Sequence, residues 1–205
     1  MGTDLLERAH NAAYRFPPEF AGFTATVSTS AGTTGSITVT GKREIGYELA
    51  AASEDDAAWL REQVASILGH RWNTSFAEGD GRFPHRSQDD GDPTGTLVHL
   101  EGDRMSSAYR VGGEEIREVH RTAGETRFTI VVSGSIYTPE GRLPNHFSVY
   151  YWDLARNRLT KADQYRDVYT ECGGVFLPAS RTITTADDQG LVTRVLTFGA
   201  HEVIR

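Results

Sequence analysis

Cysteine is almost absent from the sequence, and this scarcity excludes two kinds of site. The chain of 205 residues holds one cysteine, Cys172. A single thiol can build neither a disulfide framework nor a metal site with several thiolate ligands. Long apolar runs are missing as well, since no segment approaches the ~20 residues of a membrane-spanning helix. The sequence therefore predicts no membrane span.

Basic residues are outnumbered by acidic ones. The chain has 21 Lys and Arg against 28 Asp and Glu, which gives a formal net charge of −7. Nucleic-acid binding needs a basic face for the phosphates, so we expect no nucleic-acid partner. The first residues, Met1 to Ala13, include acidic side chains and no continuous apolar segment, unlike a secretory signal. We therefore expect a cytoplasmic protein.

The length of the chain favours one domain, because domains commonly span ~100–200 residues. A compact chain of this size buries roughly 70% of its unfolded surface and needs no disulfide or metal to hold its core. We predict that residues 1–205 form a single domain.

Two segments show the apolar periodicity of helices. The first covers residues 4–16 and the second covers residues 54–68. Ser53 and the acids after it are typical of a helix start, because the hydroxyl accepts from an exposed amide and the acids suit the positive end of the helix dipole. Each helix has one apolar face, so each must pack against another element.

Most of the remaining chain alternates between apolar and polar residues and is rich in β-branched and aromatic side chains, as strands are. The predicted strands cover residues 23–27, 36–40, 44–49, 70–76, 95–100, 105–111, 115–121, 127–137, 146–152, 163–172, 177–185 and 191–203. Short turns separate them, so successive strands should pair antiparallel. A sheet with this many strands tends to curl. The expected fold class is therefore mainly β (α+β), with a large curved antiparallel sheet and two helices.

One polar segment, residues 77–94, interrupts the run of strands. A structureless stretch of this length in a compact domain is either a functional lid or disordered, and both interpretations remain open. His85-Arg86 together with Asp89, Asp90 and Asp92 could line a mouth or chelate weakly, although the spacing of the acids does not match a calcium-binding loop.

Several motifs carry a resemblance to known families. The first set is Phe20 to Ala25, Gly35 to Val39, Asp163-Gln164-Tyr165, and Gly173-Gly174-Val175 leading to Pro178. On these motifs and the order of its elements, the chain resembles the LolA/LolB-like lipoprotein carriers. A second set, Gly69-His70-Arg71, Ser107 to Val111 and Leu177-Pro178, makes it similar to a bacterial family of unknown function with the same architecture. The resemblance implies an open half-barrel covered by two helices, with a cavity, and it supplies no catalytic residues.

Aromatic residues are plentiful, with three Trp, eight Tyr and nine Phe. The concave face of a curved sheet must be filled by side chains or by a ligand. Tyr and Trp combine apolar area with a polar tip, which suits the wall of a pocket. The expected ligand-binding residues are Tyr109, Tyr150, Trp152, His70 and Arg71. The alternatives are that the aromatics pack the core and that His70 and Arg71 satisfy the last carbonyls of the second helix.

None of the seven histidines has the spacing of a metal motif, so the metal and the cofactor stay unknown. Side chains two apart on a strand share a face, which places His120 beside Glu118 and His146 beside Tyr150 and Trp152. If the protein is an enzyme, we expect His120 and His146 to be catalytic, because imidazole titrates near neutrality. The alternative for each is a hydrogen-bonded or surface histidine.

Two functions from different classes fit these patterns. The first is binding of an apolar or amphipathic small molecule in the concave cavity of the sheet. The second is an enzyme that acts on an apolar metabolite by cyclisation, isomerisation or a metal-assisted step, using the cavity histidines. The sequence contains neither a nucleophile elbow nor a phosphate-binding loop. An exposed sheet edge also allows a homodimer.

Overall fold

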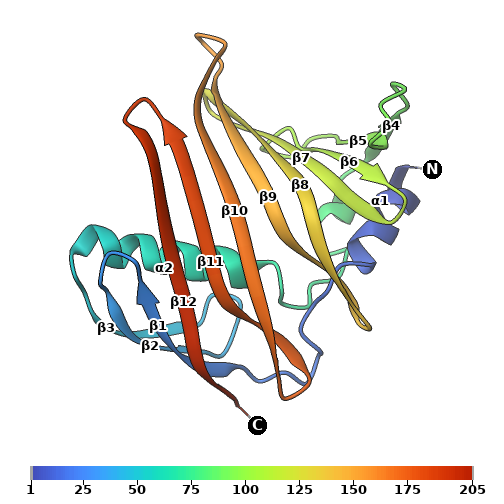
Figure 1. The fold of residues 1–205 in the computed structure, drawn as a ribbon. Helices are drawn as coiled ribbons and strands as arrows, with labels where there is room; N and C mark the ends of the chain where they lie inside the picture. The colour runs from blue at the N-terminus through green and yellow to red at the C-terminus, as the bar shows by residue number, and fades with distance from the viewer. Residues whose placement is uncertain (1, 205) are drawn as a thin grey trace. The chain divides into compact units, whose positions relative to one another are not determined.

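The computed structural model describes residues 2–204, which are mostly β-strand (Figure 1). The helices are α1 (Gly2–Asn11) and α2 (Glu54–Gly69), with a 3-10 turn η1 (Asp80–Arg82). The strands are β1 (Phe23–Thr29), β2 (Thr34–Val39), β3 (Ile45–Ala50), β4 (His85–Gln88), β5 (Thr96–Leu100), β6 (Ala108–Gly112), β7 (Glu115–Ala123), β8 (Thr126–Thr138), β9 (Gly141–Asp153), β10 (Arg158–Cys172), β11 (Val175–Asp187) and β12 (Gly190–Val203). The predicted mainly β fold class with two helices is confirmed.

The strands form one sheet in the order β3-β2-β1-β12-β11-β10-β9-β8-β7-β6-β5-β4. Every neighbour in this order except β1 and β12 is also a neighbour along the chain, as short turns between antiparallel strands require. β1 and β12 pair antiparallel from Phe23 opposite Val203 to Thr29 opposite Leu196. The large antiparallel sheet expected from the turn spacing is therefore present.

The chain divides into two compact units. The first unit comprises the chain up to Tyr14, Thr74–Tyr165 and Thr185–Val192. The second comprises Arg15–Asn73, Arg166–Thr184 and the chain from Thr193 onward. Strands β10, β11 and β12 contribute residues to both units. The single domain expected from the chain length stays a prediction.

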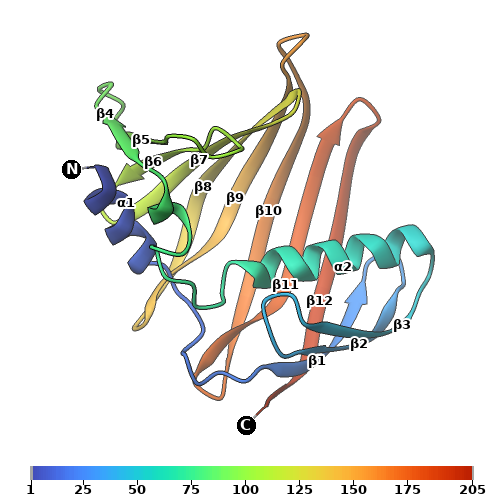
Figure 2. The same ribbon diagram turned by 180° about the vertical axis from the view of Figure 1, so that it is seen from behind.

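Helix α1 closes the apolar core of the first unit. Its side chains Leu6 and Ala9 are buried with Val98 and Leu100 of β5 and with Tyr109 of β6. α1 contacts β4, β6 and β7 and lies on one face of this part of the sheet (Figure 2). Because strand side chains alternate between faces, the same strands present a second set of residues on the face away from α1.

Helix α2 is the main helix of the second unit, and its start follows the sequence pattern. The Ser53 hydroxyl accepts a hydrogen bond from the Asp56 backbone N–H at 3.1 Å, and acidic residues fill the first turn. The predicted apolar stripe is buried: Leu60, Val64, Ile67 and Leu68. Within residues 2–204, neither helix has the length and apolarity needed to cross a membrane.

Residues 70–76 form no strand, so that prediction is wrong. The backbone N–H of Phe16 donates to the carbonyl of Arg71 at 2.7 Å, which ties this segment to the N-terminal part of the second unit. The Trp72 ring packs against Phe16 and Phe20, with centroids 5.5 and 5.7 Å away. The aromatic residues that made the segment look like a strand are used in core packing instead.

The first helix is shorter than the predicted residues 4–16. α1 ends at Asn11, and Ala13 forms an isolated bridge with Arg142. The backbone N–H of Tyr14 then donates to the Arg142 carbonyl at 2.8 Å, and its side chain is buried. Phe16, the last residue of the predicted apolar stripe, is buried in extended chain, which is why the apolar pattern continues past the end of the helix.

The segment 77–94 contains regular structure, so the expectation of a disordered segment is wrong, while the expectation of a functional lid stays a prediction. It contains η1 and the short strand β4, which pairs antiparallel with β5 from His85 opposite Leu100 to Gln88 opposite Leu97. β4 is an edge strand of four mostly polar residues, a composition that the sequence pattern cannot separate from a loop.

Candidate functional site

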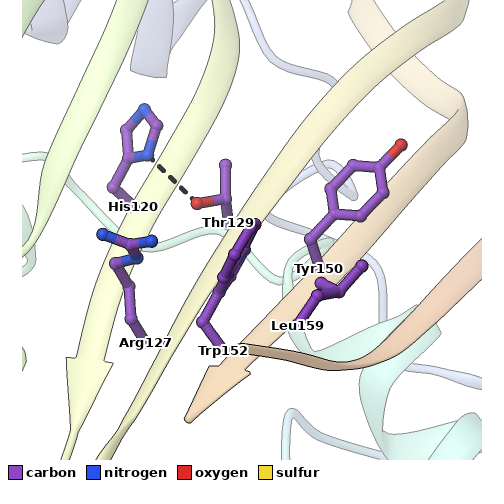
Figure 3. Close-up of a pocket in the computed structure, with 6 residues that line it drawn as sticks. All are labelled: His120, Arg127, Thr129, Tyr150, Trp152 and Leu159. Carbon is purple, nitrogen blue, oxygen red and sulfur yellow. Dashed lines mark hydrogen bonds between the residues drawn. The ribbon is translucent and has the colours of Figure 1, made fainter. Parts of the chain in front are cut away.

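Six side chains of the first unit surround an open hollow of about 580 Å³ (Figure 3). They come from four consecutive strands of the sheet and are His120, Arg127, Thr129, Tyr150, Trp152 and Leu159. We call this space the hollow and the six side chains its lining. Three of the lining residues, His120, Tyr150 and Trp152, are residues that the sequence predicted for a site.

Strand register explains why these residues meet. His120 of β7 lies opposite Thr129 of β8, and Thr129 lies opposite Tyr150 of β9. Arg127 lies opposite Trp152 one step further along the same face. Directly opposed residues in an antiparallel pair point to the same side, so the hollow lies on the sheet face away from α1.

The hollow combines apolar area with a cation. Trp152 is half-buried, whereas Tyr150 and Leu159 are exposed large side chains. The Arg127 guanidinium stands over the Trp152 ring, 5.3 Å from its centroid. This cation–π contact holds a positive charge beside the aromatic surface. A molecule that lies on Trp152 therefore has a cationic group within reach.

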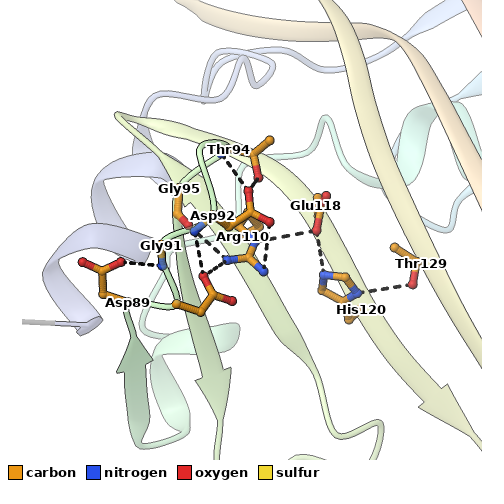
Figure 4. Close-up of polar contacts among 10 residues, drawn as sticks. Asp89, Gly91, Asp92, Thr94, Gly95, Arg110, Glu118, His120 and Thr129 are labelled. Atoms are coloured by element: carbon orange, nitrogen blue, oxygen red, sulfur yellow. Dashed lines mark hydrogen bonds and ion pairs between the residues drawn. The ribbon is translucent and has the colours of Figure 1, made fainter.

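His120 is held on both ring nitrogens. Its Nε2 lies 2.9 Å from Glu118 Oε2, and its Nδ1 lies 3.2 Å from Thr129 Oγ1 (Figure 4). When the imidazole is neutral and its Nε2–H donates to the Glu118 carboxylate, Nδ1 accepts from the Thr129 hydroxyl. The Thr129 oxygen then keeps its lone pairs for a ligand in the hollow. Glu118 thus fixes the ring that sets the hydrogen-bonding role of Thr129.

Arg110 continues this polar chain away from the hollow. Its side chain is almost fully buried, and it donates to Asp90 Oδ1 at 2.7 Å and to the Gly95 carbonyl at 3.1 Å (Figure 4). Asp92 and Glu118 complete the charges around it, at 3.7 and 3.8 Å. The hydrogen bond from Arg110 holds the pKa of Asp90 below its ordinary value. Arg110 therefore clamps residues 89–95 and also faces the carboxylate that orients His120.

Arg110 was not among the predicted site residues. The loop aspartates were expected to line a mouth or to chelate weakly, whereas Asp90 and Asp92 neutralise this arginine. A usable signal was an arginine near the end of the predicted strand 105–111 in a chain with an acidic loop at 77–94, because a buried charge needs partners.

Two further predicted residues of the first unit do not line the hollow. Tyr109 lies opposite Val119 and points to the α1 side of the sheet, where its hydroxyl accepts from Arg121 at 3.0 Å. Burial raises the pKa of Tyr109 to about 12. His146 pairs with Gly134 at a register shift, and its ring leaves no room for a side chain at Gly134.

His70 and Arg71 belong to the second unit, so they are not part of the hollow. His70 is the C-terminal cap of α2, and its backbone N–H donates to the Leu68 carbonyl. Arg71 donates to the Tyr169 hydroxyl at 3.0 Å. The end of α2 is thus held by the backbone N–H groups of both residues at the Leu68 carbonyl, while the Arg71 side chain reaches Tyr169. A ligand-binding role for the two side chains stays a prediction.

Two of the seven histidines lie near each other on one sheet face. His99 and His120 flank Ala108 across neighbouring strands of the same sheet face. Burial lowers the pKa of His99, and the nearby charges of Arg86 and His120 lower it further. Across the described part of the chain, no three His, Cys, Asp or Glu side chains gather in a group that could hold a metal ion.

Fold and site together define a mostly β protein with an amphipathic hollow on one sheet face. Residues 1–204 match the family described as protein of unknown function DUF3386, and the chain belongs to this family. The expected membership of a family of unknown function is therefore confirmed. No curated protein and no solved structure matches the chain.

Proposed function

We propose that the hollow binds an amphipathic small molecule with an apolar body and an anionic or hydrogen-bond-accepting head. The observation that carries the proposal is the convergence of an aromatic surface, Trp152 and Tyr150, with the Arg127 cation and the His120–Thr129 pair. Few polar groups among apolar side chains are typical of small-molecule sites, where the polar groups orient the ligand.

The energetics favour a weak, exchangeable ligand. Covering about 150 Å² of apolar surface contributes about 4 kcal/mol before the costs of association are subtracted. The hollow is open, so the head group of the ligand stays partly solvated and its ion pair with Arg127 adds little. Shape and apolar contact therefore determine affinity, and Arg127 determines the preference for a negative head.

The resemblance to LolA/LolB-like carriers supports ligand binding by this class of sheet, and we propose that the chain shares their half-barrel architecture. The proposed site differs from the expected one in its position. The sequence placed Tyr109 in one wall with Tyr150 and Trp152, but strand register puts Tyr109 on the α1 side. The proposed ligand therefore lies on the opposite face, against the hollow.

Titration with decanoate and with decanol tests the proposal, followed by calorimetry for every variant and by NMR of the indole N–H signals for the chains that keep Trp152. We expect decanoate to shift the Trp152 signal and Trp152→Ala to abolish binding of both probes. Arg127→Gln should weaken decanoate about fivefold and leave decanol unchanged, because only the carboxylate uses the charge. The matched control is Arg82→Gln, which removes a cation–π contact with Phe83 elsewhere in the same unit. No saturable shift with either probe would refute the proposal.

A second function, the enzyme alternative, has one specific observation in its favour. Glu118 orients His120 toward the Thr129 hydroxyl at the edge of the hollow, an arrangement that suits an imidazole for proton transfer. In an isomerisation, Nδ1 of His120 would release the Thr129 hydroxyl, take a proton from one carbon of the substrate and return it to another. Conversion of a β,γ-unsaturated cyclohexenone to its conjugated isomer, followed by absorbance, tests this. Equal rates for the wild type and His120→Ala would exclude the role, and His146→Ala is the control because His146 lies outside the hollow.

A further inference from the structure

The β9–β10 hairpin exposes apolar side chains next to the hollow. Leu154 and Leu159 are each 41% exposed, and Leu159 lines the hollow together with the exposed Tyr150. Leu154 is the first residue after β9, at the start of the turn that leads to β10. The turn is held in place because the Leu154 backbone N–H donates to the Glu125 carbonyl at 2.9 Å.

Basic residues surround these apolar side chains, although the chain as a whole is acidic. Residues 150–161 contain three basic side chains and one acidic side chain, within a chain of net charge −7, and one of the three bases, Lys161, is paired with Asp163 at 3.0 Å. The single acid, Asp153, is neutralised by Arg156 at 2.5 Å, while Arg156 itself stays largely exposed. Arg158 is exposed as well, and Arg127 adds a cation on the neighbouring strand. The hairpin is therefore both locally basic and locally apolar.

A second hairpin of the same unit shows that exposed apolar side chains alone do not produce this combination. At the β11–β12 turn, Leu191 is 73% and Val192 is 56% exposed. The acids Asp187 and Asp188 precede them in the turn. A negatively charged surface would repel this turn, whereas it would attract the β9–β10 turn.

We propose that the β9–β10 hairpin docks on an anionic lipid surface, with Leu154 and Leu159 entering the headgroup region. Trp and Tyr favour the membrane interface, and arginines can reach lipid phosphates while their stems cover apolar atoms. Each arginine near an anionic leaflet strengthens binding about fivefold. The acidic remainder of the chain is repelled by such a surface, which leaves this hairpin as the part that faces it.

The shape of the patch favours lipid over a protein partner. A stable protein interface needs about 800 Å² on each side, but the apolar side chains here sit at a turn. The turn extends past the β7–β8 turn of the same unit (Figure 1). A protruding turn enters a headgroup layer readily, while a flat partner would contact only its tip. The proposal goes beyond the small-molecule function and does not require the hollow to be occupied.

Co-sedimentation with vesicles tests the proposal on the full chain without any added ligand. We expect binding to phosphatidylcholine vesicles that contain roughly 30% phosphatidylglycerol, because anionic headgroups attract basic segments. Binding to pure phosphatidylcholine should be much weaker. Raising the salt should release the protein, because exposed charges are screened. Leu154→Asp should reduce binding at least tenfold, and Arg156→Gln with Arg158→Gln about 25-fold.

The matched control is Leu191→Asp on the acidic hairpin, which should leave vesicle binding unchanged. Equal sedimentation with and without vesicles would overturn the proposal, and so would equal binding to neutral and anionic vesicles. Gel filtration without vesicles provides the remaining comparison: if Leu154→Asp dissociates an oligomer, the patch joins copies of this chain and the lipid assignment is wrong. The decanoate titration is independent of these outcomes, so either proposal can fail alone.

Discussion

The two units treat polar side chains in opposite ways. In the second unit, Arg181 makes two parallel hydrogen bonds of 2.8 Å to the Asp167 carboxylate, and both side chains are buried. Arg181 also donates to the Ser66 hydroxyl at 3.1 Å. In the first unit, His120 and Thr129 are only half-buried and border the open hollow. A polar network closed on itself stabilises a fold, whereas a network that ends at a hollow can serve a ligand.

A second closed network in the second unit joins α2 to the β1–β2 hairpin. Asp56 accepts from the Thr29 hydroxyl at 2.5 Å and from the Thr33 backbone N–H at 3.3 Å. Arg194 of β12 forms an ion pair with the same carboxylate. Burial raises the pKa of Asp56, but the hydrogen bonds from Thr29, Thr33 and Arg194 outweigh it, so the pKa lies below its ordinary value. Three elements thus depend on one carboxylate.

The largest effect should come from breaking the Asp167–Arg181 pair. Asp167→Ala leaves a buried guanidinium without its main partner, and removal of one member of such a pair costs about 3–5 kcal/mol. The double variant Asp167→Leu with Arg181→Met should be clearly more stable than Asp167→Ala, because no charge is left buried. Urea denaturation measures both. If the single and double variants are equally unstable, the network is not closed as described.

A smaller effect is expected at Asp56, where the response also depends on pH. Asp56→Asn should cost about 2 kcal/mol at pH 7, because it removes charge-assisted hydrogen bonds. Since the pKa of Asp56 is lower in the folded than in the unfolded chain, the carboxylate stabilises the fold above the unfolded pKa. That contribution is lost as pH falls through the folded pKa. Thermal unfolding from pH 7 to pH 3 should therefore show a flatter decline for Asp56→Asn, and parallel declines would contradict this role.

Arg110 tests the boundary between the two kinds of network, because it is buried yet leads to the hollow. Arg110→Lys keeps the charge but loses the several contacts of the guanidinium, at a cost of about 1–2 kcal/mol. We expect faster hydrogen exchange in residues 89–95 and weaker decanoate binding, since Glu118 loses a neighbour. Unchanged exchange in that segment would show that Arg110 does not clamp it.

The smallest effect is expected at Arg156, whose pair with Asp153 is exposed on the arginine side. Arg156→Ala should change the free energy of unfolding by less than about 1 kcal/mol, as is usual for surface pairs. Urea denaturation beside the Asp167 variants gives the comparison directly. A loss as large as that of Asp167→Ala would remove the distinction between the units.

Local patterns predicted much of this structure. Ser53 and its acids marked the start of α2 because capping depends on neighbouring residues only. Period-two alternation placed Tyr150 and Trp152 on one face of β9, and His120 with Glu118 on one face of β7. Each of these conclusions needed a single element.

The predictions that failed depended on how separate elements pair and pack, which the local sequence pattern does not contain. Tyr109 and His120 are on neighbouring strands, and only the register shows that they point to opposite faces. β4 is recognisable by its pairing with β5, since its own residues look like a loop. Contrary to the prediction, Trp72 is not in a strand, because its ring packs against Phe16 and Phe20 near the N-terminus.

The three tryptophans lie in different surroundings, so their fluorescence reports on different parts of the molecule. The Arg194 guanidinium stands over the Trp59 ring, 3.9 Å from its centroid, and Trp72 packs among the phenylalanines of the second unit. Trp152 alone among them borders the hollow. In a chain with Trp59→Phe and Trp72→Phe, the tryptophan fluorescence would therefore come from Trp152 alone. Its emission wavelength and quenching would respond to a ligand in the hollow, without any attached dye.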